Sequence, residues 1–194
     1  MDHIYLAALL GKDALMLRRA IAAAAAAAAL ILVPVAGAQA AVSPGTYAAT
    51  YDDLNAKTGV HLQTGTPECT VAADLTVSCT GYELGGVGNT NADVDLSATY
   101  VADVLCNNPA GSKNRNNDVE AQQQILNATT SLSNLRAKNG RLDVPPVTVG
   151  PDTGTNPCPN KNWTAEYVNL ELVAFVYTLT FKGESGAYIT IAQP

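Results

Sequence analysis

A run of apolar residues near the C-terminus, residues 170–181 (LELVAFVYTLTF), constrains the fold most strongly. The run is rich in β-branched and aromatic residues, and both of its alternating faces are apolar. Leu172 and Val176 are expected on one face. Phe175 and Tyr177 are expected on the other. A strand that is apolar on both faces is typical of the centre of a sheet that lies beneath a second layer, so we expect a β-sandwich organised around it.

Other stretches have the alternating pattern of strands. Residues 94–106 alternate cleanly between apolar and polar side chains, which predicts a long half-buried strand. The dipeptide Asn139-Gly140 between two strand-like stretches predicts a hairpin turn. We therefore expect an all-β fold, a single-domain antiparallel β-sandwich of the immunoglobulin-like or jelly-roll-like kind. Further strands are expected within residues 41–51, 60–62, 69–84, 118–137, 141–149 and 187–192.

The N-terminal part has the features of a signal peptide. The basic pair Arg18-Arg19 precedes a continuous apolar run, residues 20–33, and the tripeptide Ala-Gln-Ala at residues 38–40 resembles a cleavage site. We expect a helical signal peptide over residues 1–40, followed by a β-sandwich domain over residues 41–194.

Two details of this leader stay open. Residues 1–15 carry acidic side chains that fit no leader pattern, so Met16 is a more convincing start than Met1. An uncleaved membrane anchor is the alternative to a signal peptide, because residues 20–35 almost reach the length of a span. Alanine is only weakly apolar, which favours cleavage and no membrane insertion afterwards.

The charge of the chain argues against one class of partner. The formal net charge is -6 at pH 7, and no run of Lys or Arg lies beyond the leader. Nucleic acid is therefore not expected as a partner. We expect a secreted, extracellular protein whose acidity aids its solubility.

All four cysteines lie in the expected exported domain, and an even number in an oxidising compartment predicts two disulfides. A hairpin folded around Asp74 would place Cys69 directly opposite Cys79, within bridging distance. This pairing leaves Cys106 with Cys158, and that closure would contribute about 4 kcal/mol. The alternative is that one of these cysteines links the two sheets, as in immunoglobulin domains.

Few residues in the sequence favour catalysis. His61 is the one histidine beyond the leader, and no Gly-x-Ser-x-Gly motif accompanies it. With the cysteines bridged, nucleophilic catalysis has little support, and zinc lacks ligands. We expect a protein that is not an enzyme and needs no cofactor. A hydrolase that uses two carboxylates stays open, because it needs only a suitable separation between them.

One stretch is a weak candidate for a metal site. Asn89, Asn91, Asp93 and Asp95 place side-chain oxygens at every second residue, as calcium loops do. The glutamate that closes an EF-hand is missing, however. The two aspartates would equally fit the solvent face of a strand.

One aromatic pair is a candidate for ligand binding. Trp163 and Tyr167 could form a flat platform for a sugar ring. The alternative, which we favour, is that Trp163 covers the core beside the disulfide of Cys158.

Two cysteine segments carry a resemblance to known proteins. Cys106-Asn-Asn-Pro and Cys158-Pro-Asn-Lys-Asn-Trp163, together with the closing strands, resemble segments of small secreted bacterial proteins of unassigned function. Those proteins have a Cys-x-Asn-Pro and a Cys-Pro-Asn-x-x-Trp segment that look like the two ends of one disulfide. The resemblance implies export, a β-rich fold and the pairing of Cys106 with Cys158. It implies no activity and no ligand.

These observations together predict a secreted, non-enzymatic structural or binding component of the extracellular space or cell envelope. An envelope component or a polysaccharide would be its partner. Two alternatives are a carbohydrate-binding module that uses Trp163 and a carboxylate-dependent hydrolase.

Overall fold

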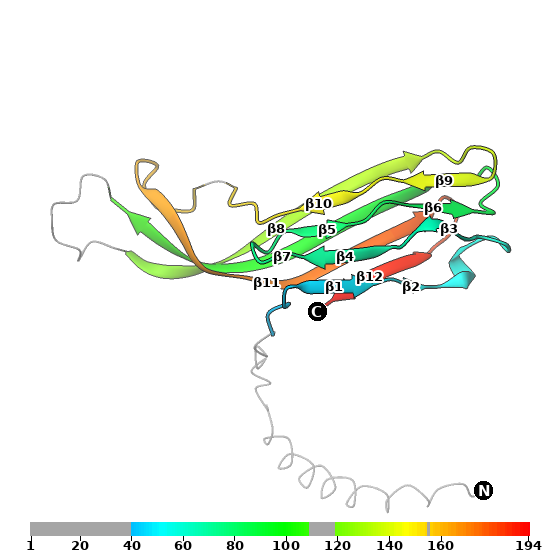
Figure 1. Ribbon diagram of the computed structural model, residues 1–194. Helices are drawn as coiled ribbons and strands as arrows, with labels where there is room; N and C mark the ends of the chain where they lie inside the picture. The colour runs from blue at the N-terminus through cyan, green and yellow to red at the C-terminus, as the bar shows by residue number, and fades with distance from the viewer. Residues whose placement is uncertain (1–39, 109–118, 155) are drawn as a thin grey trace, which may run out of the picture. The chain divides into compact units, whose positions relative to one another are not determined.

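The computed structural model describes residues 40–108, 119–154 and 156–194, which form an all-β domain (Figure 1). The expected signal peptide lies outside these residues, apart from Ala40. The described residues include no helix with the length and hydropathy that a membrane span requires. Their regular elements are a single-turn 3-10 helix, η1 (Asp53–Asn55), and the strands β1 (Gly45–Ala48), β2 (Thr50–Tyr51), β3 (His61–Gly65), β4 (Glu68–Val71), β5 (Val77–Cys79), β6 (Tyr82–Gly85), β7 (Ala92–Asn107), β8 (Val119–Leu135), β9 (Arg141–Val144), β10 (Val147–Val149), β11 (Thr164–Phe181) and β12 (Ile189–Gln193).

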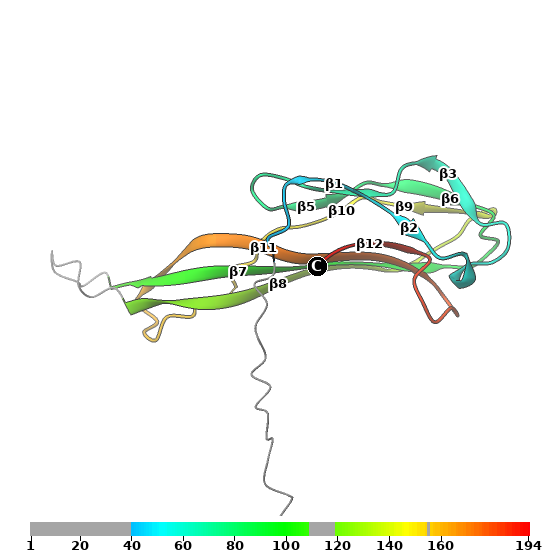
Figure 2. The ribbon, with the colours of Figure 1, turned by 90° about the horizontal axis from the view of Figure 1, so that it is seen from below.

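The strands lie in two layers that face each other across the core (Figure 2). One layer is a five-stranded sheet in the order β2-β12-β11-β7-β8. The other contains a four-stranded sheet, β1-β4-β5-β10, and a three-stranded sheet, β3-β6-β9. Every pair of neighbouring strands is antiparallel. The prediction of an all-β, antiparallel fold is confirmed.

β11 contains the apolar run and occupies the middle of the five-stranded sheet, between β12 and β7. Its register with β7 shifts around Val173, and as a result Leu172 and Phe175 are both buried beneath the second layer. The expectation that Leu172 and Phe175 lie on opposite faces is therefore wrong. A bulge adds one residue and reverses the phase of the alternation. The outer face stays open, since Val176 is 39% exposed.

β7 and β8 match their predicted character. Along β7 the buried and less buried residues alternate without a break, from Ala92 to Asn107, because successive side chains of a strand point to opposite faces. β8 forms one long strand that pairs with β7 at the edge of the sheet.

Three of the stretches in which we expected strands are divided between two sheets. Residues 141–149 form β9 and β10, which belong to different sheets. Residues 41–51 form β1 and β2, which belong to different sheets. Within residues 69–84, β5 ends at Cys79 and β6 begins in another sheet, so the second arm of the Cys69–Cys79 hairpin does not continue to residue 84. At the break, the Thr80 backbone N–H donates to the Glu68 carbonyl (2.9 Å). Short strands result where the chain passes from one sheet to the next.

The hairpin turn at Asn139-Gly140 forms, but its arms soon separate. Both residues have positive φ values, 52° and 76°, as a tight hairpin turn requires. One bridge joins Lys138 to Arg141. Beyond it, β9 pairs with β6 rather than with β8, because the two strands belong to different sheets.

Side chains from both layers interlock in one core. The Tyr47 ring packs edge-on against Phe175, with ring centroids 5.4 Å apart. The Tyr82 hydroxyl lies 2.8 Å from the Tyr177 hydroxyl across the layers. The largest fully buried side chains are Tyr100, Tyr177, Phe175, Leu84, Leu96, Leu142, Leu172, Leu179, Ile189, Ile191, Val71 and Val77.

Three strands continue beyond the two-layer body. The adjoining ends of β7, β8 and β11 run past the second layer as a narrow three-stranded projection (Figures 1 and 2). We call this projection, residues 101–107, 119–125 and 164–169, the arm. β12 pairs with β11 only from Phe175 to Leu179, so it does not reach the arm.

Candidate functional site

The arm has a small apolar cluster of its own, separate from the main core. Val104 and Cys106 of β7 are buried there with Cys158, which lies in the connection between β10 and β11. A disulfide joins Cys106 to Cys158 across a sequence separation of 52 residues. In the chain-entropy account, closing such a loop contributes about 4 kcal/mol. The bridge therefore ties the connection to the arm.

The two aromatic candidates, Trp163 and Tyr167, lie in this same cluster. Both are partly buried and pack against the buried Cys106–Cys158 group. The Tyr167 hydroxyl donates a hydrogen bond to the Thr153 carbonyl (2.7 Å). Trp163 therefore covers the disulfide, as the packing alternative expects, and both rings keep part of their surface in solvent.

The second disulfide is local. Cys69 of β4 and Cys79 of β5 are directly opposite in the register and form a bridge. The turn between them contains Leu75 with a φ of 65°, and the Thr76 N–H donates to an Asp74 carboxylate oxygen (3.0 Å). Both disulfides have the expected pairing, and no cysteine is free. Neither joins a strand of one layer to a strand of the other, so the alternative of a disulfide that links the two sheets does not hold.

Two of the calcium candidates, Asn91 and Asp93, form contacts that join the ends of neighbouring strands. An Asn91 amide donates to the Asn134 side-chain oxygen (2.9 Å), and the Asn134 backbone N–H donates to Asp93 (2.7 Å). Lys182 forms an ion pair with the other oxygen of Asp93.

The remaining candidates lie apart from this network. Asp95 accepts a hydrogen bond from Ser131, and Asn89 lies in the exposed loop before β7. The described residues contain no group of three or more His, Cys, Asp or Glu that could hold a metal ion. Calcium at Asn89, Asn91, Asp93 and Asp95 stays a prediction.

Several titratable groups have shifted pKa values with clear physical causes. Burial raises the pKa of Tyr177 to about 12, and burial together with the negative charge of Asp74 raises that of Tyr100 to about 12. The pKa of Tyr82 is also raised, chiefly by burial. Hydrogen bonds lower the pKa of Asp74, where Thr76 is the donor, and that of Asp93, where Lys182 is the main donor. The shifted pKa values therefore belong to tyrosines of the core, to the turn at Asp74 and to the strand-end contacts of Asp93.

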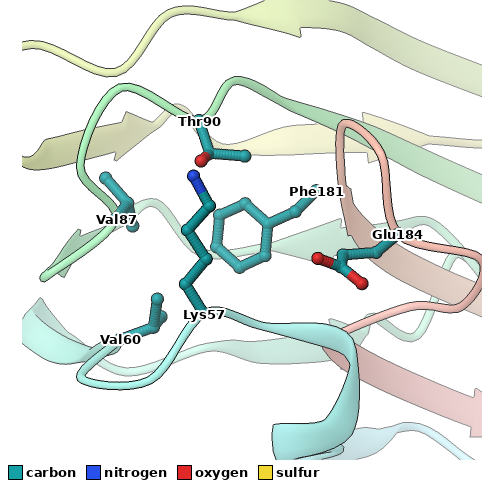
Figure 3. Close-up of a pocket in the computed structure, with 6 residues that line it drawn as sticks. All are labelled: Lys57, Val60, Val87, Thr90, Phe181 and Glu184. Carbon is teal, nitrogen blue, oxygen red and sulfur yellow. The ribbon is translucent and has the colours of Figure 1, made fainter.

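The surface has a small hollow of about 170 Å³ between the loops at one end of the domain (Figure 3). The Phe181 ring lies in the middle of the hollow, with Lys57 along one side and Glu184 on the other. The Thr90 hydroxyl is buried without a hydrogen-bond partner in the described part of the chain. Ligand pockets enclose most of the surface of their ligand, whereas this hollow encloses no room for one. Its lining residues are Lys57, Val60, Val87, Thr90, Phe181 and Glu184.

His61 has a structural role on the edge strand β3. Its Nδ1 lies 2.9 Å from the Gly59 carbonyl oxygen, within hydrogen-bond distance. The ring approaches Gly85 of the neighbouring strand closely, since a Cβ added at Gly85 would lie 2.8 Å from Nε2.

Comparison with known proteins yields no relative. No protein-family model, curated protein or solved structure matches this chain. The domain is defined as all-β with two disulfides, and the resemblance drawn from its cysteine segments stays a prediction.

Two structural features were not singled out from the sequence. One is the hydrogen bond between Tyr82 and Tyr177, for which a pair of tyrosines far apart in sequence gives no signal. The other is the position of β8 at the edge of the five-stranded sheet. The sequence does not mark it as an edge, since residues 121–135 contain no charged side chain of the kind that protects edge strands.

Proposed function

We propose that this protein is exported and acts outside the cytoplasm as a non-enzymatic structural or binding component, built as a β-sandwich of the immunoglobulin-like or jelly-roll-like kind. One observation carries the proposal: all four cysteines are paired in two disulfides. Such bonds form and persist in oxidising compartments and are rare where thiols are kept reduced. The signal-peptide pattern of residues 1–40 and the resemblance to small secreted bacterial proteins support the same location.

The chemistry of the described residues supports binding over catalysis. Both Asp74 and Asp93 have lowered pKa values, because hydrogen bonds stabilise their charged forms. The general acid of a carboxylate-dependent hydrolase needs a raised pKa instead. The cysteines are bridged and provide no thiolate. The groups whose pKa is raised are tyrosines rather than carboxyl groups.

Cell fractionation tests this proposal. The full sequence, with a C-terminal epitope tag, is expressed in a bacterial host beside a variant that lacks residues 17–40. We expect the full-length protein outside the cytoplasm, with both disulfides formed, and the truncated variant in the cytosol. Equal cytosolic recovery of the two forms, with free thiols in both, would overturn the proposal.

The second candidate function is recognition of a polysaccharide by the arm. The observation in its favour is that Trp163 and Tyr167 lie in one cluster and both retain exposed surface. Aromatic rings of this kind combine a large apolar area with a polar tip. A sugar ring could therefore stack on the exposed part of Trp163.

Tryptophan fluorescence can test this candidate directly, because the chain has one Trp. If the arm binds sugar, titration with soluble polysaccharides shifts the Trp163 emission and protects it from a soluble quencher. Trp163→Ala then loses binding in a pull-down with insoluble polysaccharide, whereas Val176→Ala, a change on the open face of the body, retains it. An emission spectrum that no polysaccharide alters rules the candidate out.

A further inference from the structure

β8 is a long, regular strand with an open edge. It is the last strand of the five-stranded sheet, and in the described residues no strand pairs with its outer side. Its register with β7 continues without a shift from Leu132 to Gln122. β10 approaches it near Thr130, whose hydroxyl donates to the Thr148 carbonyl (3.2 Å). The open edge therefore includes residues 123–129, where alternate N–H and C=O groups have no strand to bond with.

This edge lacks the features that usually prevent strands from pairing. Residues 121–135 contain no charged side chain and no proline. Ile125 is 66% exposed on the outer face. Edge strands are commonly protected by lysines, prolines or bulges. A regular edge without them can pair with an added strand.

The opposite edge of the arm is different. There β11 carries the acidic residue Glu166, and Glu171 follows just beyond the arm. The register of β11 with β7 shifts between Val168 and Glu171 and again, outside the arm, between Leu172 and Ala174. Asn169 has a φ of 52° within the same stretch. Charge and bulges both oppose strand addition, so the two edges of the arm are not equivalent and β8 is the receptive one.

The charge of the chain indicates where a second copy could approach. Each copy carries a formal charge of -6, so two copies repel each other over most of their surfaces. Residues 121–135 form a neutral stretch along which this repulsion is least. An antiparallel β8–β8 contact about a two-fold axis uses the same patch on both copies and closes on itself. A contact between β8 of one copy and β11 of the next would instead build an open-ended assembly. It would also require pairing at the β11 edge, which charge and bulges protect.

We propose that two copies of this chain form a symmetric dimer by antiparallel pairing of β8 with β8, centred on residues 123–129. The pairing joins the two five-stranded sheets into one continuous sheet. This inference goes beyond the proposed function, and its test does not depend on where the protein is located.

Light scattering coupled to size-exclusion chromatography tests the dimer. The protein is expressed from residues 1–194 and measured in the form in which it is recovered, over a range of concentrations. We expect the molar mass to be twice that of one chain at high concentration. The double variant Gln123→Lys/Ile125→Lys adds the charges that protect edges, and we expect it to halve the molar mass. Both side chains are exposed, so the fold should tolerate lysine.

Val176→Lys is the matched control. Val176 lies on the same outer face but on β11, away from the β8 edge, so this variant should dimerise like the wild type. A wild-type monomer at every concentration would overturn the proposal. So would a double variant that remains dimeric, or dissociation caused by Val176→Lys, because the contact would then use the sheet face. Open-ended assemblies in place of a dimer would also contradict it.

Hydrogen exchange provides a readout that needs no variant. Amides of residues 123–129 should exchange more slowly as the protein concentration rises, while those of β11 in the arm should not change. Concentration-dependent protection of β11 without protection of residues 123–129 would contradict β8 pairing.

Discussion

The hydroxyl groups of Tyr82 and Tyr177 lie 2.8 Å apart and join the two layers of the domain inside its core. Tyr82 belongs to the three-stranded sheet and Tyr177 to the five-stranded sheet. Both side chains are almost completely buried, with relative exposures of 4% and 1%. Each hydroxyl therefore depends on the other for a hydrogen bond.

A double-mutant cycle should reveal this dependence. Tyr177→Phe leaves the Tyr82 hydroxyl buried without its partner, which costs about 1–3 kcal/mol of unfolding free energy. In the double variant Tyr82→Phe/Tyr177→Phe no polar group is left unpaired, so the total cost should be less than the sum of the two single costs. Chemical denaturation of the four proteins measures this coupling. Strictly additive costs would show that the hydroxyls do not interact.

Alkaline pH should destabilise the domain through the buried tyrosines. Burial raises the pKa of Tyr177 and of Tyr100 to about 12, from an ordinary value of 10.0. Above pH 10 the unfolded chain releases these protons while the native state keeps them, so the native state binds more protons and its stability falls as pH rises. The contribution of the protonated, buried tyrosines to the stability of the native state is therefore complete below pH 10 and lost by about pH 12.

Denaturation at a series of pH values checks this expectation. The variant Tyr82→Phe/Tyr177→Phe should lose less stability than the wild type between pH 10 and pH 12, since two of the tyrosines responsible are absent. Equal losses in the two proteins would show that other groups cause the alkaline sensitivity.

Gly86 permits a close approach between two loops. It has a φ of 74°, and a Cβ added there would lie 2.0 Å from the Gly59 carbonyl oxygen. Gly88 has a similar φ, 62°, but nothing lies within 4 Å of its added Cβ. Gly88→Ala should cost about 1–2 kcal/mol from backbone conformation alone, and Gly86→Ala should cost clearly more. Thermal unfolding of the pair measures the difference, and equal melting temperatures would argue against this contact.

The sequence predicts the elements whose pattern is local. The alternation of β7 from Ala92 to Asn107, the hairpin that pairs Cys69 with Cys79, and the turn at Asn139-Gly140 all follow from periodicity or turn chemistry. Each depends on residues close together in the chain.

Features that depend on distant partners are not predictable in this way. The bulge near Val173 depends on how β11 and β7 match in length, and the break after Cys79 depends on which sheet accepts β6. Among the candidate site residues, the sequence predicts that Trp163 packs beside the disulfide of Cys158. The sequence does not predict the hydrogen bond between the side chains of Asn91 and Asn134, because contacts between strand ends across a sheet leave no sequence signal.

The arm should depend on its disulfide more than the body does. Replacing Cys106 and Cys158 by serine removes a constraint worth about 4 kcal/mol in the chain-entropy account. We expect amide exchange to accelerate first in residues 101–107 and 164–168, where the small cluster around Val104 is the main apolar packing. The same replacement at Cys69 and Cys79 should leave exchange in the arm unchanged. Uniform acceleration across the domain in both variants would show that the arm is not a separate unit of stability.

The most direct test of the two-layer, disulfide-bonded domain is peptide mapping by mass spectrometry without reduction. The protein is expressed from residues 1–194 and digested with its cysteines unreduced. Two linked peptide pairs should be found, Cys69 with Cys79 and Cys106 with Cys158, and the first peptide should begin at residue 41. Free thiols in a chain that still begins at residue 1, or a link between Cys69 or Cys79 and either of the other two cysteines, would contradict the account.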